Sequence, residues 1–238
     1  MSGAGRAGIL GQPRLHLRQT DSTNDRAREL AGAGAPHGTL VTAAEQTAGR
    51  GRHGRRWLAP AGSALLMSLL LRSPPPLLPL AAAVAVCDVA GSEAQIKWPN
   101  DIVVPTPRGL AKLAGILIEG RPQEDWAVLG IGLNVAVDLV QLPRELRARS
   151  ATLGLRPTQI ESTLQRLLAA LERRLADTAQ ATLAAWRARD ALRGRTIAWA
   201  SGQGRAQGID GAGRLIVALS GGGQSTLQAG EVHLLEVS

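Results

Sequence analysis

The sequence predicts a protein of the α/β (α+β) class with a small β-barrel at its C-terminal end. Apolar, β-prone runs alternate with helical patterns over the first 190 residues, and short strands separated by Gly-rich turns follow from Leu192. Hydrophobic residues make up 45% and charged residues 19% of the 238-residue chain, which favours a globular protein over a disordered or fibrous one. We expect one domain over residues 1–190 and a smaller one over residues 191–238.

Composition also restricts the compartment. Cys87 is the single cysteine, so an intrachain disulfide is excluded and a reducing cytoplasm is expected. The segment Met1–Gln12 is Gly/Ala-rich without the apolar core of a signal peptide. The apolar stretch Ala64–Val86 is broken by Arg72 and four prolines, and so falls short of the roughly 18 continuous residues that a membrane span needs. We therefore expect a cytoplasmic protein that makes no use of a membrane.

The first elements carry polar residues. Capping residues at 21–24 precede a short helix over residues 25–31, which Gly32 and Gly34 end. A β-prone run at residues 39–43 leads into a segment over 45–57 in which glycines alternate with arginines. Such a segment predicts a mobile cationic loop whose backbone can approach an anionic ligand closely. It lacks the Gly-Lys-Ser/Thr ending of a Walker loop.

The middle of the chain alternates strands with one buried helix. Residues 64–71, 112–119 and 126–135 read as apolar strands, and residues 77–90 as a buried helix ended by Gly91. Pro99 interrupts the β-prone stretch 95–104, because proline cannot donate to a sheet ladder. The polar residues around Pro99 are therefore expected at a turn or bulge, facing a cleft.

The last third predicts helices followed by the barrel. A capping box from Thr158 to Glu161 opens an amphipathic helical pattern that continues toward Arg189, with a break near Asp177. Five short strands are predicted at residues 196–200, 204–209, 214–219, 225–227 and 232–237. The scattered histidines and buried-helix Cys87 give no metal or nucleophile signature.

Rare residue types mark the candidate site. The chain has 27 Lys+Arg, no Phe and no Tyr, and its only lysines and asparagines are Lys97, Lys112, Asn24, Asn100 and Asn134. Each lies in a short polar segment, or island, between apolar runs. We expect these to be positions where arginine cannot replace the lysine ammonium and a small apolar residue cannot replace the asparagine amide.

Five such islands together resemble the biotin protein ligase family. The matching motifs, in the family's order, are Ser22-Thr23-Asn24, Gln46 with the Gly49–Trp57 loop, Lys97–Asp101, Lys112–Glu119 and Gly130–Val135. The resemblance implies a mixed central sheet with flanking helices of the biotin/lipoate ligase type, forming a catalytic biotin- and ATP-binding domain over residues 1–190. It also implies a small SH3-like β-barrel over residues 191–238.

The implied activity is formation of biotinyl-5′-AMP from biotin and ATP, with Mg²⁺, followed by transfer to a lysine of a biotin carboxyl carrier domain of the acetyl-CoA carboxylase type. The implied catalytic residues are Lys112, Arg50, Arg52 and Asp101, the last also a Mg²⁺ ligand. The implied biotin-binding residues are Ser22, Thr23, Asn24, Gln46, Gly49, Arg50, Arg52, Lys112, Gly115, Gly130 and Gly132. The implied nucleotide-binding residues are Arg52, Arg55, Trp57, Lys97, Asn100 and Asn134.

Three alternatives remain open on the sequence alone: a lipoate ligase-like transferase, a basic RNA-binding protein and a biotin sensor without activity. The net charge of +8 is expected to steer an acidic carrier domain. About twenty residues precede the first motif, too few for a three-helix DNA-binding domain, so we expect no DNA partner. Either a monomer or a homodimer is compatible with the sequence.

Overall fold

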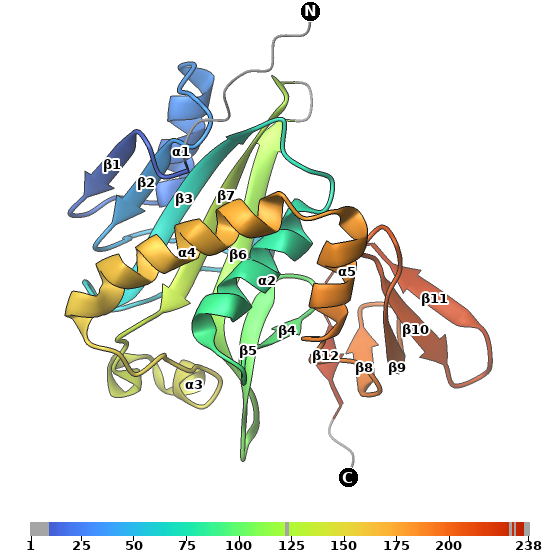
Figure 1. The fold of residues 1–238 in the computed structure, drawn as a ribbon. Helices are drawn as coiled ribbons and strands as arrows, with labels where there is room; N and C mark the ends of the chain where they lie inside the picture. The colour runs from blue at the N-terminus through green and yellow to red at the C-terminus, as the bar shows by residue number, and fades with distance from the viewer. Residues whose placement is uncertain (1–9, 122–123, 229, 231, 236–238) are drawn as a thin grey trace, which may run out of the picture.

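The computed structural model describes residues 10–121, 124–228, 230 and 232–235. Most of the predicted segment Met1–Gln12 and the end of the predicted strand 232–237 therefore lie outside the described residues. The central sheet has seven strands in the order β1-β2-β3-β7-β6-β5-β4, seen in Figure 1. The β1–β2 pair is parallel and the other neighbouring pairs are antiparallel, which confirms the mixed sheet. The bounds of its strands are Arg14–Leu17, Leu40–Ala43, Ala64–Arg72, Gln95–Lys97, Asp101–Thr106, Gly109–Arg121 and Trp126–Asn134 for β1 to β7.

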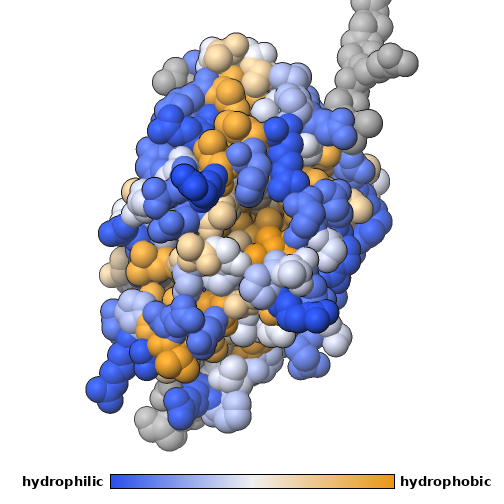
Figure 2. Space-filling view, turned by 90° about the vertical axis from the view of Figure 1, so that its left-hand side faces the viewer, coloured by the Kyte–Doolittle hydropathy of each residue, from blue (hydrophilic) through white to orange (hydrophobic). Residues whose placement is uncertain are grey.

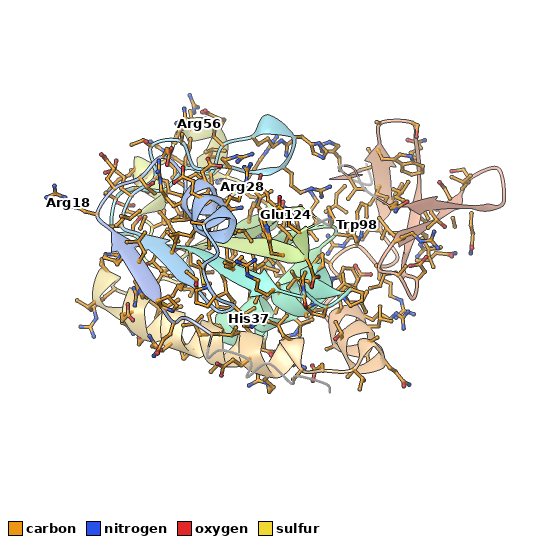
Figure 3. All side chains as sticks on the ribbon, turned by 90° about the horizontal axis from the view of Figure 1, so that it is seen from above. Arg18, Arg28, His37, Arg56, Trp98 and Glu124 are labelled. Carbon is orange, nitrogen blue, oxygen red and sulfur yellow. The ribbon has the colours of Figure 1, made fainter. Side chains whose placement is uncertain are left out.

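Helices cover both faces of this sheet. Helices α2 and α4 lie on one face and α1 on the opposite one, as Figures 1 and 3 show together. Strand β3 is therefore buried on both sides, which explains why it reads as a continuous apolar run without polar alternation. The helix bounds are Thr23–Gly32, Leu78–Ala90, Arg144–Arg147, Ile160–Leu175 and Ala179–Arg187 for α1 to α5.

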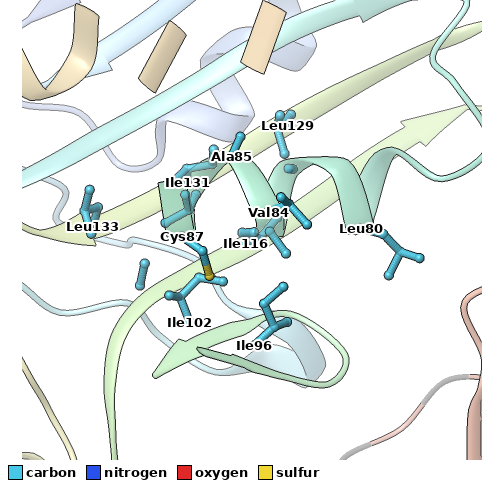
Figure 4. Close-up of a cluster of buried hydrophobic side chains, with 14 of the residues drawn as sticks. Leu80, Val84, Ala85, Cys87, Ile96, Ile102, Ile116, Leu129, Ile131 and Leu133 are labelled. Atoms are coloured by element: carbon cyan, nitrogen blue, oxygen red, sulfur yellow. The ribbon is translucent and has the colours of Figure 1, made fainter. Parts of the chain in front are cut away.

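The main core lies between the sheet and α2. In Figure 4, Val84 and Cys87 of α2 lie with Ile96, Ile102 and Ile116 of the strands, all of them buried. Burial raises the pKa of the Cys87 thiol to about 12, so it is inert in the folded protein. The predicted helix end at Gly91 is confirmed: this residue has φ 108°, a conformation that glycine adopts without steric cost.

The face with α1 has a core of its own, to which the helix contributes alanines. Ala27 and Ala31 of α1 contact Val41, Leu70 and Val128 of the sheet. Seen from the side of β1 and α1, hydrophobic residues gather in a central hollow ringed mostly by hydrophilic ones (Figure 2). Among the described residues, no helix is long and apolar enough to cross a membrane.

The C-terminal strands form a second sheet, in which all neighbours are antiparallel and the order is β11-β10-β9-β8-β12. Their bounds are Thr196–Trp199, Gly202–Ile209, Leu215–Leu219, Gln224–Leu227 and His233–Leu234 for β8 to β12. The segment before β8 adds a bridge to the central sheet, since Ile96 pairs with Asp190. The domain boundary between residues 190 and 191 stays a prediction.

One local prediction is wrong and one is confirmed. The capping box from Thr158 to Glu161 does not form, because Gln159 precedes α4 and its side chain accepts a hydrogen bond from the Arg156 amide at 3.1 Å. The predicted break near Asp177 is confirmed, since α4 ends at Leu175 and Thr178 caps α5 by accepting from the Ala181 amide.

Asp88 joins α2 to α4 and gives the fold a pH dependence. Its carboxylate accepts hydrogen bonds from Arg174 Nε at 2.8 Å and Arg173 Nη2 at 3.0 Å. Burial raises the pKa of Asp88, but the hydrogen bonds from Arg174 and Arg173 outweigh it, and the pKa lies below its ordinary 3.8. The stabilisation is therefore complete well above pH 3.8 and is lost as the pH falls through the folded-state pKa.

We expect Asp88→Asn to flatten the fall in melting temperature between roughly pH 5 and pH 2. Thermal unfolding followed by circular dichroism measures this slope, with Glu93→Gln, a change at an exposed acid, as control. Equal slopes for Asp88→Asn and the parent protein would contradict the assignment.

Candidate functional site

A cavity of about 1160 Å³ opens on the face of the central sheet that carries α1. Its walls come from α1, the loop over residues 49–57 (the Gly/Arg loop), β6 and β7, the turn between β4 and β5, the segment after α3 and the C-terminal sheet. The structure brings together every predicted site residue except Gly49. The lining residues among those predicted are Ser22, Thr23, Asn24, Gln46, Arg50, Arg52, Arg55, Trp57, Lys97, Asn100, Asp101, Lys112, Gly115, Gly130, Gly132 and Asn134.

Gly49 lies at the base of the loop. A Cβ at this position would lie 2.6 Å from the Trp57 carbonyl oxygen and 2.9 Å from Gln46 Nε2. The Trp57 amide also donates to the Gly49 carbonyl at 2.9 Å. The absence of a side chain at Gly49 therefore lets the two ends of the loop close on each other.

A buried polar cluster forms one end of the cavity. Gln46 Oε1 accepts hydrogen bonds from the Thr23 amide at 2.7 Å and from Thr23 Oγ1 at 3.0 Å. Ser68 Oγ lies 2.8 Å from Thr23 Oγ1 and 2.6 Å from Asn24 Oδ1. Ser22 is the N-cap residue of α1 but makes no side-chain cap bond. The helix start therefore presents polar groups to the cavity, and the cluster fixes their orientation.

Asn24 lies over a glycine of the sheet. A Cβ on Gly130 would come within 2.1 Å of Asn24 Oδ1, so only glycine admits the side chain in this position. Asn24 Nδ2 donates to Glu119 Oε2 at 2.9 Å and reaches the Leu117 carbonyl at 3.4 Å. The amide is thus held from both of its ends.

Arg50 connects the loop to this cluster. Its guanidinium pairs with Asp25 Oδ1 at 2.6 Å and with Glu119 Oε1 at 2.9 Å. Arg52 reaches Asn100 Oδ1 at 3.4 Å across the cavity. The two loop arginines are therefore anchored on opposite walls, one by carboxylates and the other by an amide.

Lys112 lies midway along the cavity wall that β6 provides. Its ammonium is 2.6 Å from Asp101 Oδ1 and 5.6 Å from the centre of the Trp57 ring. A Cβ on Gly132 would lie 2.5 Å from that ring, so the indole rests directly on the sheet. The Trp57 indole N–H is buried and has no hydrogen-bond partner within the described residues.

The nucleotide-binding candidates have structural partners as well. Asn100 Nδ2 donates to the Ile116 carbonyl at 2.9 Å, and Asn134 Nδ2 to the Ala151 carbonyl at 2.8 Å. Each amide thereby holds a cavity-lining segment in place. Lys97 and Arg55 line the same cavity.

Charge in the cavity is strongly one-sided. Nine arginines and lysines line it against two carboxylates, Asp101 and Glu145. Among the described residues there is no group of three or more metal-ligating side chains. The arrangement therefore favours anionic ligands, and a divalent cation would need a ligand's own oxygens to complete its coordination.

Comparisons with known proteins agree with this geometry. Residues 16–135, about half of the chain, match the biotin/lipoate A/B protein ligase family, and residues 193–235 match the biotin protein ligase C-terminal domain. The chain belongs to the biotin/lipoate A/B protein ligase family. It is 37% identical over 244 residues to the biotin--[acetyl-CoA-carboxylase] ligase of Mycobacterium tuberculosis, covering 92% of this chain and 88% of that protein.

Further relatives match over shorter stretches or in fold. The bifunctional ligase/repressor BirA of Bacillus subtilis is 40% identical over 158 residues, which cover 61% of this chain. The chain thus spans about half of that relative, 47% of its length. The biotin protein ligase of Aquifex aeolicus solved with biotin and ATP has a TM-score of 0.76 at 24% identity, covering 95% of this chain and all of that one, which confirms the fold.

Sequence reasoning missed two polar residues of this cavity. Ser68, fully buried in β3, holds both Thr23 and Asn24; its signal is one hydroxyl inside an apolar strand. Glu119 bridges Asn24 and Arg50, and its signal is a carboxylate at the end of the apolar motif 112–119. The C-terminal wall, which includes residues 194–196, was also missed because it is remote in the sequence.

Proposed function

We propose that this chain activates biotin as biotinyl-5′-AMP with ATP and transfers the biotinyl group to a lysine of a biotin carboxyl carrier domain of a carboxylase. Family membership supports the ligase class. The observation that carries the assignment is that one cavity holds the buried polar cluster, the loop arginines and the Lys112 ammonium. A carboxylate bound at the polar cluster and a phosphate bound at the arginines would meet at this ammonium.

The first step joins two anions. A biotin carboxylate oxygen forms a bond to the α-phosphorus of ATP, the bond to the bridging oxygen breaks, and pyrophosphate leaves with the electron pair. Lys112 touches both the carboxylate and the α-phosphate, since a compact ammonium has three donors. Arg50 and Arg52 clamp phosphate oxygens and stabilise the charge that develops on them.

The second step is amide formation. The carrier lysine, as the neutral amine, attacks the acyl carbon, the bond from that carbon to the phosphate oxygen breaks, and AMP leaves while the amine proton passes to solvent. The Gly/Arg loop shelters the mixed anhydride from water until this attack.

The remaining roles follow the two ends of the cavity. The ureido ring and sulfur of biotin are bound by the polar residues Ser22, Thr23, Asn24 and Gln46. Biotin lies over the sheet glycines Gly115, Gly130 and Gly132, and Gly49 allows the two ends of the loop to approach each other. Trp57 covers adenine, and the other nucleotide contacts come from Arg55, Lys97, Asn100 and Asn134. Asp101 supplies one carboxylate to this region. Mg²⁺ is often bound by one or two protein carboxylates when substrate phosphates and waters complete its coordination shell. Bound there, Mg²⁺ would neutralise phosphate charge.

The proposed setting is the cytoplasm, where carboxylase carrier domains, ATP and biotin meet. We expect the reaction to be compatible with either a monomer or a homodimer.

Biotin-dependent exchange of pyrophosphate into ATP tests the first step. Exchange with biotin, none with lipoate or octanoate, and release of biotinyl-5′-AMP on denaturation are expected. Exchange with lipoate alone would assign the chain to lipoate chemistry, and no exchange with any acid would remove the proposal.

The loop over residues 49–57 should respond to ligands. We expect its backbone amides to exchange hydrogen more slowly with biotin and ATP together than in the free protein, because a closed loop gains hydrogen bonds and loses contact with water. Hydrogen exchange followed by mass spectrometry measures this. Identical exchange in both states would contradict loop closure.

A further inference from the structure

The cavity continues past the reacting centre, and the strand register shows where. Along β6, the Leu117 carbonyl lies near Asn24, Gly115 lies beneath the Trp57 ring, and Lys112 follows toward the hairpin end. At about 3.3 Å per residue, the Lys112 backbone lies roughly 16 Å from Leu117 and roughly 13 Å from the turn at Arg108. The Lys112 side chain reaches back along β6, since a Cβ on Gly115 would lie 3.3 Å from Lys112 Nζ. The reacting carbon at Lys112 therefore has the polar cluster on one side and a further stretch of cavity on the other.

The cavity is large, and its outer stretch has walls of its own. The whole cavity measures about 1160 Å³, above the roughly 300–1,000 Å³ of small-molecule sites. Its outer walls are the β5–β6 turn, the segment after α3 and the start of β8. A lysine side chain approaching the acyl carbon from the side opposite to the biotin ring must pass between these walls.

Each outer wall presents an exposed arginine with an anchored backbone. The Arg108 amide donates to Thr106 Oγ1 at 3.2 Å, the Arg149 carbonyl accepts from the Lys112 amide at 2.6 Å, and the Arg195 carbonyl accepts from the Ala206 amide at 2.9 Å. Within the described residues, none of the three guanidiniums pairs with a carboxylate, unlike Arg50. Three cations whose backbones are hydrogen-bonded thus line the cavity without a carboxylate partner among the described residues.

We propose that Arg108, Arg149 and Arg195 form a docking surface for acidic residues beside the acceptor lysine of the carrier domain. The inference rests on the proposed function and goes beyond it by naming the surface that meets the protein partner. Charge complementarity favours this occupant, because the three arginines line the cavity and none of them is among the residues assigned to biotin or nucleotide. Pairs of this kind steer association and are weakened by salt.

The test separates adenylation from transfer. The triple variant Arg108→Gln, Arg149→Gln, Arg195→Gln is compared with a control of equal charge change, Arg18→Gln, Arg156→Gln, Arg166→Gln, at exposed positions outside the cavity. Arg18 lies at the end of the molecule away from the C-terminal sheet (Figure 3). Pyrophosphate exchange and trapping of biotinyl adenylate with hydroxylamine report on adenylation, and labelling of an apo carrier domain reports on transfer.

We expect the KM for the carrier domain to rise about tenfold in the first triple variant, with a weaker salt dependence, while hydroxamate formation stays within about twofold of the parent. A raised KM for ATP or a lost hydroxamate signal would instead assign these arginines to the phosphates and overturn the proposal. An equal rise in the control variant would reduce the effect to net charge and overturn it too, as would an unchanged KM. Absent pyrophosphate exchange in the parent protein would reject the proposed function itself and the docking surface with it.

Discussion

Lys112→Ala is expected to lower the rate of biotin-dependent pyrophosphate exchange by about 10²–10³-fold, the usual effect of removing one charge-stabilising donor. The ammonium lies 2.6 Å from Asp101 and is directed into the cavity, whereas the backbone of residue 112 keeps its strand pairing in the variant. Initial rates at saturating biotin and ATP measure the loss.

Lys112→Arg provides the sharper comparison. A planar guanidinium retains the charge but not the compact geometry that touches a carboxylate and a phosphate together, so we expect little recovery of the rate. Melting temperatures of both variants should stay close to that of the parent. Full activity of Lys112→Ala in a folded protein would refute the assigned role.

Gly130→Ala is expected to weaken biotin binding by at least about tenfold while ATP binding changes little. The new Cβ would come within 2.1 Å of Asn24 Oδ1, so Asn24 must leave its bonds to Ser68 and Glu119. Removing one partner of a buried hydrogen bond leaves the others unsatisfied, which costs about 1–3 kcal/mol. Isothermal titration with biotin and with ATP separates the two affinities.

Gly32→Ala is the matched control, because this glycine ends α1 and a Cβ there would meet nothing within 4 Å. It should leave biotin affinity unchanged. Parent-like biotin binding by Gly130→Ala would mean that Asn24 makes no contact on which binding depends.

Much of this architecture could be predicted from the sequence because its elements are long or have clear ends. The buried helix α2 and strand β3 show in their apolar runs, and Pro99 marks the turn between β4 and β5. The candidate site could be predicted because Lys112 and the asparagines are rare in this chain. Their convergence on one cavity depends on strand order, which periodicity does not encode.

What sequence reasoning missed depends on distant partners. Strand β1 has four residues that are mostly exposed, and its parallel pairing with β2 defines it. The predicted capping box at Thr158 was wrong because Gln159, one residue later, bonds the preceding backbone instead. Ser68 and Arg195 gain their significance only from the groups that the fold brings beside them.

The bridge before β8 has a consequence for how the two sheets can move. The Ile96 amide donates to the Arg189 carbonyl at 2.7 Å, and the Ala191 amide donates to the Ile96 carbonyl at 3.0 Å, so the chain entering the second sheet covers the outer edge of β4. An uncovered strand edge invites pairing with another molecule and aggregation. A rotation of the C-terminal sheet about this junction would break the two hydrogen bonds and expose the edge of β4. The same two bonds therefore both restrain that rotation and disfavour self-association through the edge.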